Sequence, residues 1–200
     1  MHFFEVLKDF DIILGSRSPR RKWLLEESGI PFRVLVKETN EDFCNNRRPD
    51  EIVISLSKSK AEMFAKELEN DKTIVITADT IVVIDGKIIN KPGNEQEAIE
   101  MLKYLSGRTH EVFTGVCIIG NNFHKEFYDR SLVRFMPFEE EEIIYYINKY
   151  KPFDKAGSYG IQEWLGFIGI ESIEGSFFNV MGLPIHKVYS ALKDFVKTIS

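Results

Sequence analysis

The sequence predicts an α/β fold with a mixed sheet, formed by one domain over residues 1–200 that could have two lobes around a cleft. Strand-like apolar runs alternate with helical patterns in the first half, which favours parallel strands joined by helices. Two hairpin signals, Asp85-Gly86 and Asn121-Asn122, follow in the middle and predict antiparallel pairs. No linker, repeat or low-complexity stretch interrupts the 200 residues.

The first half is expected to hold a strand over 12–14, a helix over 18–29, a strand over 32–36, a polar loop over 37–48, a helix from 49 to about 70 and a strand over 73–78. Ser18 is a favoured N-cap and Pro19 suits the first helical position, so the first helix begins there. Gly29 ends it as a C′ glycine. Pro49, followed by two acidic residues, opens the long helix.

The second half is expected to hold a hairpin over 81–90, a helix over 94–107, strands over 111–119 and 123–135, a helix over 139–150, loops and short strands over 152–183 and a helix over 185–199. Asn94 with Glu97 resembles a capping box, and Gly107 ends the helix that they open. The terminal segment is amphipathic. These elements extend the mixed sheet and supply helices to cover it.

The composition excludes several classes of protein. A net charge of -5 and a pI near 5.5 argue against a general nucleic-acid binder. Two cysteines, Cys44 and Cys117, are too few for a disulfide framework or a structural zinc site. The charged N-terminus does not resemble a signal peptide, and no apolar run approaches the roughly 20 residues of a membrane helix. The expected location is the cytoplasm, with no membrane partner and no stable nucleic-acid partner.

A cluster of positive charge lies in the turn between the first strand and the first helix. Arg20 and Arg21 occupy the first helical turn, where the helix dipole makes a cation unfavourable by roughly 0.3 to 1 kcal/mol. An anion bound there would explain them, with the Ser16 and Ser18 hydroxyls as further donors. A solvated basic turn, or arginines paired with acids elsewhere, explains the pattern equally well.

Lys60 interrupts an apolar stripe in the long helix. Ile52, Leu56 and Phe64 share its face at intervals of four residues, so Lys60 points inward or along the wall of a cleft. A lone ammonium is costly in that position. Snorkelling to the surface is the common solution. A phosphate partner is the functional alternative.

Asp79 separates two β-rich runs and is either a structural hydrogen-bond acceptor, a base or a metal ligand. Lys91 could return a cation to the same place, and Glu41 and Asp42 could supply oxygen ligands for a magnesium-like ion. Together these groups suit the hydrolysis of a phosphoanhydride. P-loop, dinucleotide-binding and serine-hydrolase signatures are absent from the sequence. His110 is expected to have a core or surface role, because no partner pattern accompanies it.

Five ordered motifs resemble those of the Maf family, nucleoside triphosphate pyrophosphatases also described as septum formation inhibitors. They are SRSPRR at 16–21, ADTIVVIDGKIINKP at 78–92, LSGRTHEVFTGV at 105–116, DKAGSYGIQ at 154–162 and IEGSFFNVMGLPI at 173–185. The resemblance covers nearly the whole chain. It implies an elongated, twisted mixed sheet with flanking helices around a central cleft, similar to the inosine triphosphatase fold, and a possible homodimer.

The resemblance also implies a reaction. Family members cleave a nucleoside triphosphate between the α- and β-phosphates, giving the monophosphate and pyrophosphate, with a divalent cation such as Mg²⁺, Mn²⁺ or Co²⁺. Asp79 would be the general base and a metal ligand, and Glu41 the other metal ligand. The triphosphate would be bound by Ser16, Arg20, Lys60 and Lys91.

Specificity follows from three further matches. Arg21, Thr80 and Gln162 match the branch that acts on dTTP and UTP, which implies a house-cleaning enzyme for these or for modified pyrimidine nucleotides. A nucleotide-binding regulator of septum formation, a 7-methyl-GTP pyrophosphatase and a phosphatase releasing orthophosphate are the alternatives. Arg17 and Asn40 depart from the family pattern, which expects a small residue and an aspartate there.

Overall fold

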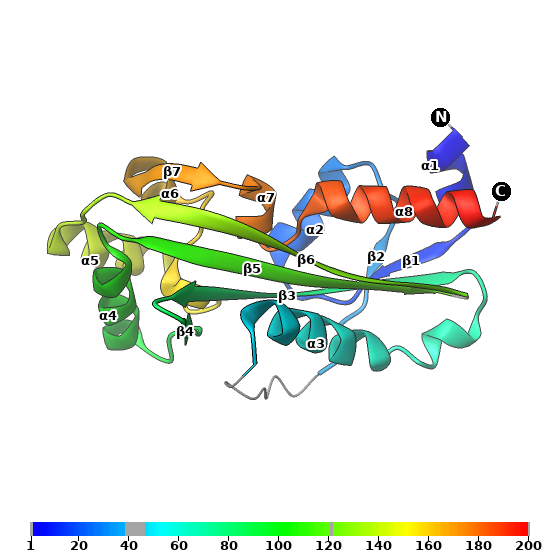
Figure 1. Cartoon of the computed structure of the whole chain (residues 1–200), viewed down its shortest axis with the longest axis horizontal. Coiled ribbons are helices and arrows are strands. Elements are labelled where there is room, and N and C mark those ends of the chain that lie inside the picture. The colour runs from blue at the N-terminus through cyan, green and yellow to red at the C-terminus, as the bar shows by residue number, and fades with distance from the viewer. Residues whose placement is uncertain (1, 39–46, 121, 200) are drawn as a thin grey trace. The chain divides into compact units, whose positions relative to one another are not determined.

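A computed structural model describes residues 2–38, 47–120 and 122–199 (Figure 1). Its elements in chain order are α1 (His2–Leu7), β1 (Asp11–Leu14), α2 (Pro19–Glu27), β2 (Arg33–Val34), α3 (Pro49–Glu62), η1 (Glu67–Glu69), β3 (Thr73–Ile84), β4 (Lys87–Ile89), α4 (Glu95–Leu105), β5 (Thr109–Gly120), β6 (Phe123–Phe135), α5 (Glu140–Tyr150), η2 (Ala156–Ser158), α6 (Trp164–Gly169), β7 (Ile170–Glu174), α7 (Phe177–Val180) and α8 (Ile185–Ile199). In this part of the chain, no helix is long and apolar enough to cross a membrane.

The strands form a mixed sheet. Within the described residues its order is β2-β1-β3-β5-β6-β7, with β4 paired to β3. β1 pairs in parallel with β2 and β3, whereas β4 and β7 pair antiparallel to β3 and β6. The predicted α/β class with a mixed sheet and flanking helices is therefore confirmed.

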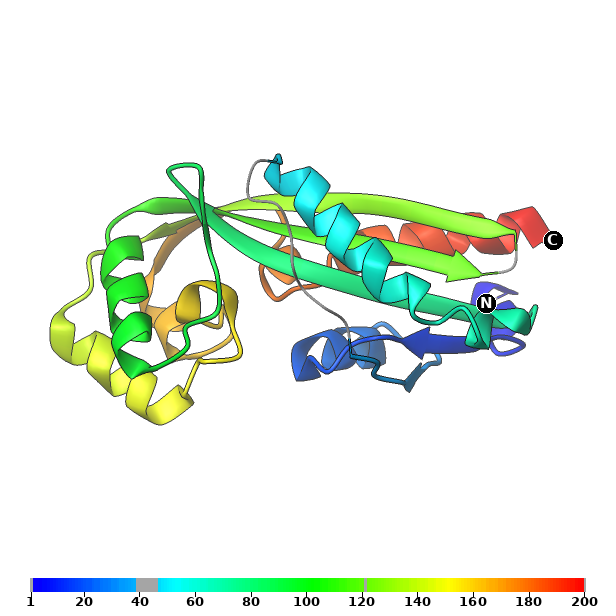
Figure 2. The same ribbon diagram turned by 90° about the horizontal axis from the view of Figure 1, so that it is seen from below.

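The chain divides into two compact units. The first unit contains residues 1–79, 114–129 and 182–200, and the second contains 80–113 and 130–181. Three strands, β3, β5 and β6, contribute residues to both units. In the first unit, α3 and α8 lie on opposite faces of the strands (Figures 1 and 2). The assignment of residues 1–200 to one domain stays a prediction.

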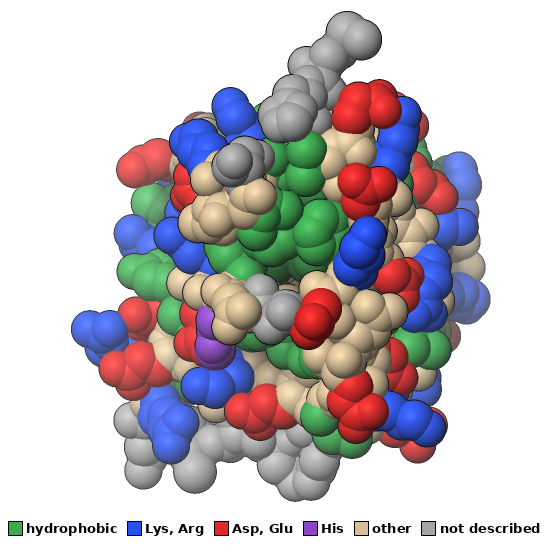
Figure 3. Space-filling model, turned by 90° about the vertical axis from the view of Figure 1, so that its right-hand side faces the viewer, with side chains coloured by type: hydrophobic (Ala, Val, Ile, Leu, Met, Phe, Trp, Pro, Cys, Tyr) green, Lys and Arg blue, Asp and Glu red, His purple; other side chains and the backbone are tan. Residues whose placement is uncertain are grey.

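Both termini lie at one end of the first unit, where aromatic rings join the first and last helices to the sheet. The Phe3 ring is 4.8 Å from Tyr189 of α8. Phe195, also in α8, is 4.9 Å from Phe10 and 5.2 Å from Phe123, between ring centroids. This end of the unit has an apolar surface bordered by charged side chains (Figure 3). The rings tie both ends of the chain to β6.

The structure differs from the predicted elements in several places. α6 and α7 are short helices in the segment that was expected to hold loops and short strands. β3 runs without a break from Thr73 to Ile84, so Asp79 lies within a strand and does not end one. A polar residue can stay in a strand when its side chain finds a partner. α3 ends at Glu62 and a separate 3-10 turn follows, so the long helix is shorter than predicted. β2 retains only Arg33 and Val34 of the expected strand.

Candidate functional site

The turn after β1 places the basic segment beside β3. The Gly15 N–H donates to the Ile76 carbonyl at 2.9 Å, which continues the parallel pairing beyond β1. A Cβ on Gly15 would lie 2.9 Å from the Phe64 ring and from Thr77 Cγ2. Real Cβ atoms do not approach other atoms this closely, so a larger residue at position 15 would displace its neighbours. Glycine, which has no Cβ, fits without such a displacement. Ser16 follows Gly15, just beyond the carboxyl end of β1.

Two serines shape the start of α2. Ser16 Oγ accepts from the Ser18 N–H and from Arg21 Nη1, both at 3.2 Å. Ser18 is the N-cap, and its Oγ accepts from the Arg21 N–H at 3.4 Å. The predicted cap is confirmed. Ser16 is 8% exposed, so its hydroxyl lies within the turn.

Arg21 ties this turn to β3 and to the segment before α8. Its Nη1 donates to the Ala78 carbonyl at 2.7 Å, and its Nε donates to the Gly182 carbonyl at 2.7 Å. Ala78 is the residue before Asp79, so Arg21 fixes the backbone next to the predicted base. Unlike Arg21, the neighbouring Arg17 is exposed and lies 3.4 Å from Glu38.

Lys60 and Asp79 form an ion pair. Lys60 Nζ donates to Asp79 Oδ1, and the two side chains are only 14% and 15% exposed. The predicted inward stripe of the helix is confirmed, because Ile52, Leu56 and Phe64 are 1%, 6% and 1% exposed. The carboxylate offsets the cost of placing the ammonium on this face. The pair joins α3 to the middle of β3.

Close contacts between α3 and the sheet set the position of that pair. Thr77 Oγ1 donates to the Ser57 carbonyl at 2.6 Å, which links β3 to α3. A Cβ on Gly115 of β5 would lie 2.2 Å from the Val53 carbonyl oxygen, so only glycine allows this approach. These contacts hold α3 against β3 and β5 and place Lys60 opposite Asp79.

Arg20, a further candidate of the first unit, is half-buried in the first turn of α2, and the remaining described candidates belong to the second unit. Thr80 is half-buried and follows Asp79 in β3, whereas Lys91 is exposed just beyond β4. Gln162 is half-buried, and its Oε1 is buried without a hydrogen-bond partner among the residues that the structure describes. Glu41, with Asn40 and Asp42, lies outside the described residues. Of the predicted residues, the first unit thus brings together Ser16, Arg21, Lys60 and Asp79.

A buried network, not foreseen from the sequence, supports the segment that carries Gln162. Lys155 Nζ lies 2.7 Å from Asp154 and 3.2 Å from Glu163, with its side chain 8% exposed. Tyr146 donates from its hydroxyl to Glu163 and accepts from the Gly160 N–H at 2.9 Å. The DKAGSYGIQ block was the available signal, because it contains Lys155 and Gly160. The network holds Gly160 and Glu163, which lie on either side of Gln162 in the sequence.

His110 lies in the core of the second unit, which is one of the two roles expected for it. It is 1% exposed and its Nε2 lies 2.7 Å from the Tyr159 hydroxyl. Burial lowers the pKa of His110 from 6.5 to about 3. Burial likewise raises the pKa of Tyr159. Both groups are therefore neutral near pH 7.

The burial of His110 predicts acid sensitivity. The unfolded chain takes up a proton at this residue below pH 6.5, whereas the folded chain does so only near pH 3. Stability should therefore fall by about 1.4 kcal/mol for each pH unit below 6.5 through this group. Urea unfolding at pH 7 and pH 5 measures the change. His110→Gln should lose less stability over that interval, by about 2 kcal/mol, and equal losses would contradict the assignment.

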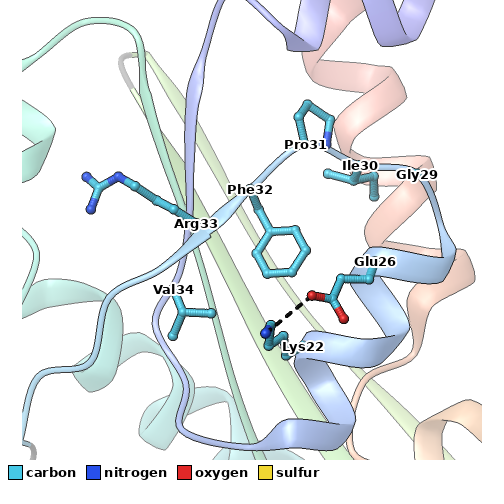
Figure 4. Close-up of a pocket in the computed structure, with 8 residues that line it drawn as sticks. All are labelled: Lys22, Glu26, Gly29, Ile30, Pro31, Phe32, Arg33 and Val34. Atoms are coloured by element: carbon cyan, nitrogen blue, oxygen red, sulfur yellow. Dashed lines mark ion pairs between the residues drawn. The ribbon is translucent and has the colours of Figure 1, made fainter.

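A pocket of about 620 Å³ lies between α2 and the segment 29–34 (Figure 4). Lys22 and Glu26 line one side and pair at 3.4 Å, while Phe32 and Val34 point toward α2 and Arg33 points away from it. Of the predicted site residues that the structure describes, none lines this pocket. The candidate site is therefore a different place in the first unit.

The fold and the site define an α/β protein in which a carboxylate and a lysine pair at a mixed sheet. The chain belongs to the Maf family: the family model described as Maf-like protein matches residues 11–195. The family resemblance of the five motifs is therefore confirmed.

The chain is similar to several curated relatives, each named dTTP/UTP pyrophosphatase. It is 49% identical to the one from Porphyromonas gingivalis over 191 residues, covering 94% of this chain and 96% of the relative. Identity to the Christiangramia forsetii protein is 44%, covering 97% and 98%. For the Bacteroides thetaiotaomicron protein it is 46%, covering 94% and 97%. A solved structure of the Staphylococcus aureus Ham1 protein matches with a TM-score of 0.39 at 18% identity, covering 62% of this chain and 71% of that one.

Proposed function

We propose that this protein hydrolyses dTTP and UTP at the α–β phosphoanhydride, giving the monophosphate and pyrophosphate. The observation that carries the proposal is the Lys60–Asp79 pair beside the turn of Ser16 and Arg21, in a chain of the Maf family. Relatives at 44–49% identity over most of the chain bear the name of this activity. The same names favour the enzyme over a purely regulatory nucleotide binder.

Asp79 is the proposed general base, and Lys60 controls it. Lys60 Nζ donates to the Asp79 carboxylate. A triphosphate carries about four negative charges, which compete for that ammonium. When Lys60 turns to the phosphates, the Asp79 carboxylate becomes available to accept a proton from the attacking water. Substrate binding and activation of the base are then coupled through one side chain.

Ser16, Arg20 and Lys91 are the other proposed phosphate ligands. The Ser16 hydroxyl lies at the carboxyl end of β1, and Arg20 lies in the first turn of α2, whose N-terminal N–H groups favour an anion. Lys91 follows β4 in the second unit. Neutralising the phosphate charge lowers the barrier to in-line attack and stabilises pyrophosphate as a leaving group.

A divalent cation is part of the proposal, with Asp79 and Glu41 as its ligands. Carboxylate oxygens are the donors that Mg²⁺ and Mn²⁺ prefer, so the chemistry of these side chains fits such an ion. The ion supplies charge neutralisation at the phosphates. The dimer, the cytoplasmic location and the lack of a stable nucleic-acid partner stay predictions.

Gln162, Arg21 and Thr80 are the proposed specificity residues. The buried Gln162 Oε1 has no hydrogen-bond partner within the described part of the chain, so it can accept one hydrogen bond from a substrate. Uracil and thymine present an N3–H donor, whereas cytosine has an acceptor at that position. Arg21 contributes by holding the Ala78 carbonyl beside Asp79, because two backbone carbonyls already engage its guanidinium.

Gln162→Leu should therefore weaken discrimination between UTP and CTP. Loss of one hydrogen bond to a buried acceptor is worth about 1–3 kcal/mol, or roughly a tenfold change or more in the ratio of kcat/KM values. Steady-state kinetics with both nucleotides measures this ratio. Gln96→Leu, at an exposed position in α4, is the matched control. An unchanged ratio in Gln162→Leu would remove Gln162 from the specificity site.

The activity itself is tested by incubating the protein with Mg²⁺ and each of dTTP, UTP, CTP, dATP, GTP and 7-methyl-GTP. We expect the monophosphate and pyrophosphate from dTTP and UTP. Orthophosphate as the product would indicate a phosphatase instead. Turnover of 7-methyl-GTP alone would keep the chemistry and reject the specificity. Binding without turnover of any nucleotide would favour the regulatory alternative.

A further inference from the structure

We propose that Cys117, His124 and Glu126 form a binding site for a soft divalent cation such as Zn²⁺, separate from the Lys60–Asp79 pair. One ligand atom from each residue lies within 4.8 Å of the other two. His124 Nε2 is 2.7 Å from Glu126 Oε1 and 3.9 Å from Cys117 Sγ. The proposal does not depend on the hydrolysis of nucleotides.

The hairpin of β5 and β6 brings these donors together. His124 and Glu126 are two residues apart in β6, so their side chains lie on the same face of the sheet. Cys117 is in β5, the neighbouring strand. Side chains on one face of adjacent strands meet directly or diagonally. All three residues belong to the first unit, so the arrangement is local.

The donor set fits Zn²⁺ better than Mg²⁺ or Ca²⁺. Thiolate, imidazole and carboxylate are the three protein ligands of zinc, whereas Mg²⁺ and Ca²⁺ take oxygen alone. Zinc–ligand bonds of about 2.3 Å to sulfur and about 2.0 Å to nitrogen place the two atoms roughly 3.5 Å apart in a tetrahedral site. The 3.9 Å between Cys117 Sγ and His124 Nε2 is close to that separation. The metal would replace the hydrogen bond between His124 and Glu126.

The three side chains differ in their access to solvent. Cys117 is buried, while the side chains of His124 and Glu126 are 53% and 26% exposed. A cation can therefore enter from the surface and reach the sulfur beneath. Burial, with the nearby charge of Glu126, raises the pKa of the Cys117 thiol to about 12. The thiolate is the form that binds a metal, so a bound cation would displace this proton.

The Lys58 ammonium competes with a bound cation for the Glu126 carboxylate. Its Nζ lies 3.4 Å from Glu126 Oε1, the same oxygen that contacts His124. Two residues span about 200° around an α-helix, so Lys58 and Lys60 leave α3 on nearly opposite sides. The proposed cation site and the Lys60–Asp79 pair therefore lie at different faces of α3. Removing the Lys58 charge should strengthen metal binding.

Calorimetric titration of the full chain with Zn²⁺ tests the proposal, in a Cys44→Ser background that leaves Cys117 as the sole thiol. We expect one ion per chain at this site, besides the cation proposed at Asp79 and Glu41. His124→Ala should weaken that binding by roughly tenfold or more, and Lys58→Gln should strengthen it. His186→Ala, which removes another exposed histidine, is the matched control and should leave it unchanged.

Co²⁺ spectroscopy identifies the sulfur ligand. We expect a thiolate-to-cobalt charge-transfer band that Cys117→Ser abolishes. Equal affinity in the parent and in His124→Ala, or cobalt binding without that band, would overturn the proposal. His124 is exposed, so its variant should fold even if the buried Cys117→Ser does not. Asp79→Asn should retain this binding, which separates the site from failure of the proposed hydrolysis.

Discussion

Asp79→Asn is expected to lower kcat for dTTP roughly a hundredfold to ten-thousandfold, which is the range for loss of a general base. The amide has the shape of the carboxylate and keeps an oxygen for Lys60, but it cannot accept a proton from water. Nucleotide binding should persist, because the proposed cationic ligands remain. Single-turnover kinetics and equilibrium binding measure the two effects separately.

Asp85→Asn is the matched control for that variant. Asp85 follows the same strand and pairs with Arg108, whose hydrogen bond lowers the pKa of the Asp85 carboxyl. Asp85 is exposed, and asparagine tolerates its positive φ of 51°. The control should keep full activity. Full activity in Asp79→Asn would instead remove Asp79 from the role of base.

Lys60→Met is expected to damage both stability and catalysis. It leaves the mostly buried Asp79 carboxylate without its ammonium partner, at a cost of about 1–3 kcal/mol in the free energy of unfolding. It also removes a proposed phosphate ligand, so KM should rise as kcat falls. Lys60→Arg keeps the charge but not the shape, and should recover part of the stability. Chemical denaturation and steady-state kinetics measure the two losses.

A double-mutant cycle with Asp79→Asn separates pairing from general disruption of α3. In Lys60→Met/Asp79→Asn no charge is left unpaired, so the double variant should be more stable than the sum of the single losses predicts. Activity should stay low in all three variants. Additive stability losses would show that the Lys60–Asp79 pair is not energetically coupled.

Local sequence features predicted the elements whose ends depend on neighbouring residues. Ser18 and Pro19 begin α2 because the cap and the fixed proline φ act within one turn. Asp85 and Gly86 turn the chain between β3 and β4, with φ angles of 51° and 72° that these residue types tolerate. The predicted end of α3, near residue 70, is wrong. The helical periodicity of the sequence continues past Glu62, but α3 ends there.

The stripe of α3 shows where sequence reasoning about the site ends. Spacing alone placed Lys60 on the buried face of its helix, since 3.6 residues per turn is a local property. It did not identify the partner, because Asp79 is 19 residues away and meets Lys60 through the packing of α3 on the sheet. The cost of burying a lone charge predicts that a partner exists, not which residue it is.

By itself, the sequence determined the α/β class, the caps and turns, the family and the residue types available for chemistry. These follow from local conformational preferences and from motifs that are contiguous in the chain. Only the tertiary structure decided that Arg21 contacts the Ala78 carbonyl, that Lys60 pairs with Asp79, and that Cys117 meets His124 and Glu126. Such contacts depend on close approaches like that of Gly115 to Val53, which arise from packing between segments distant in sequence.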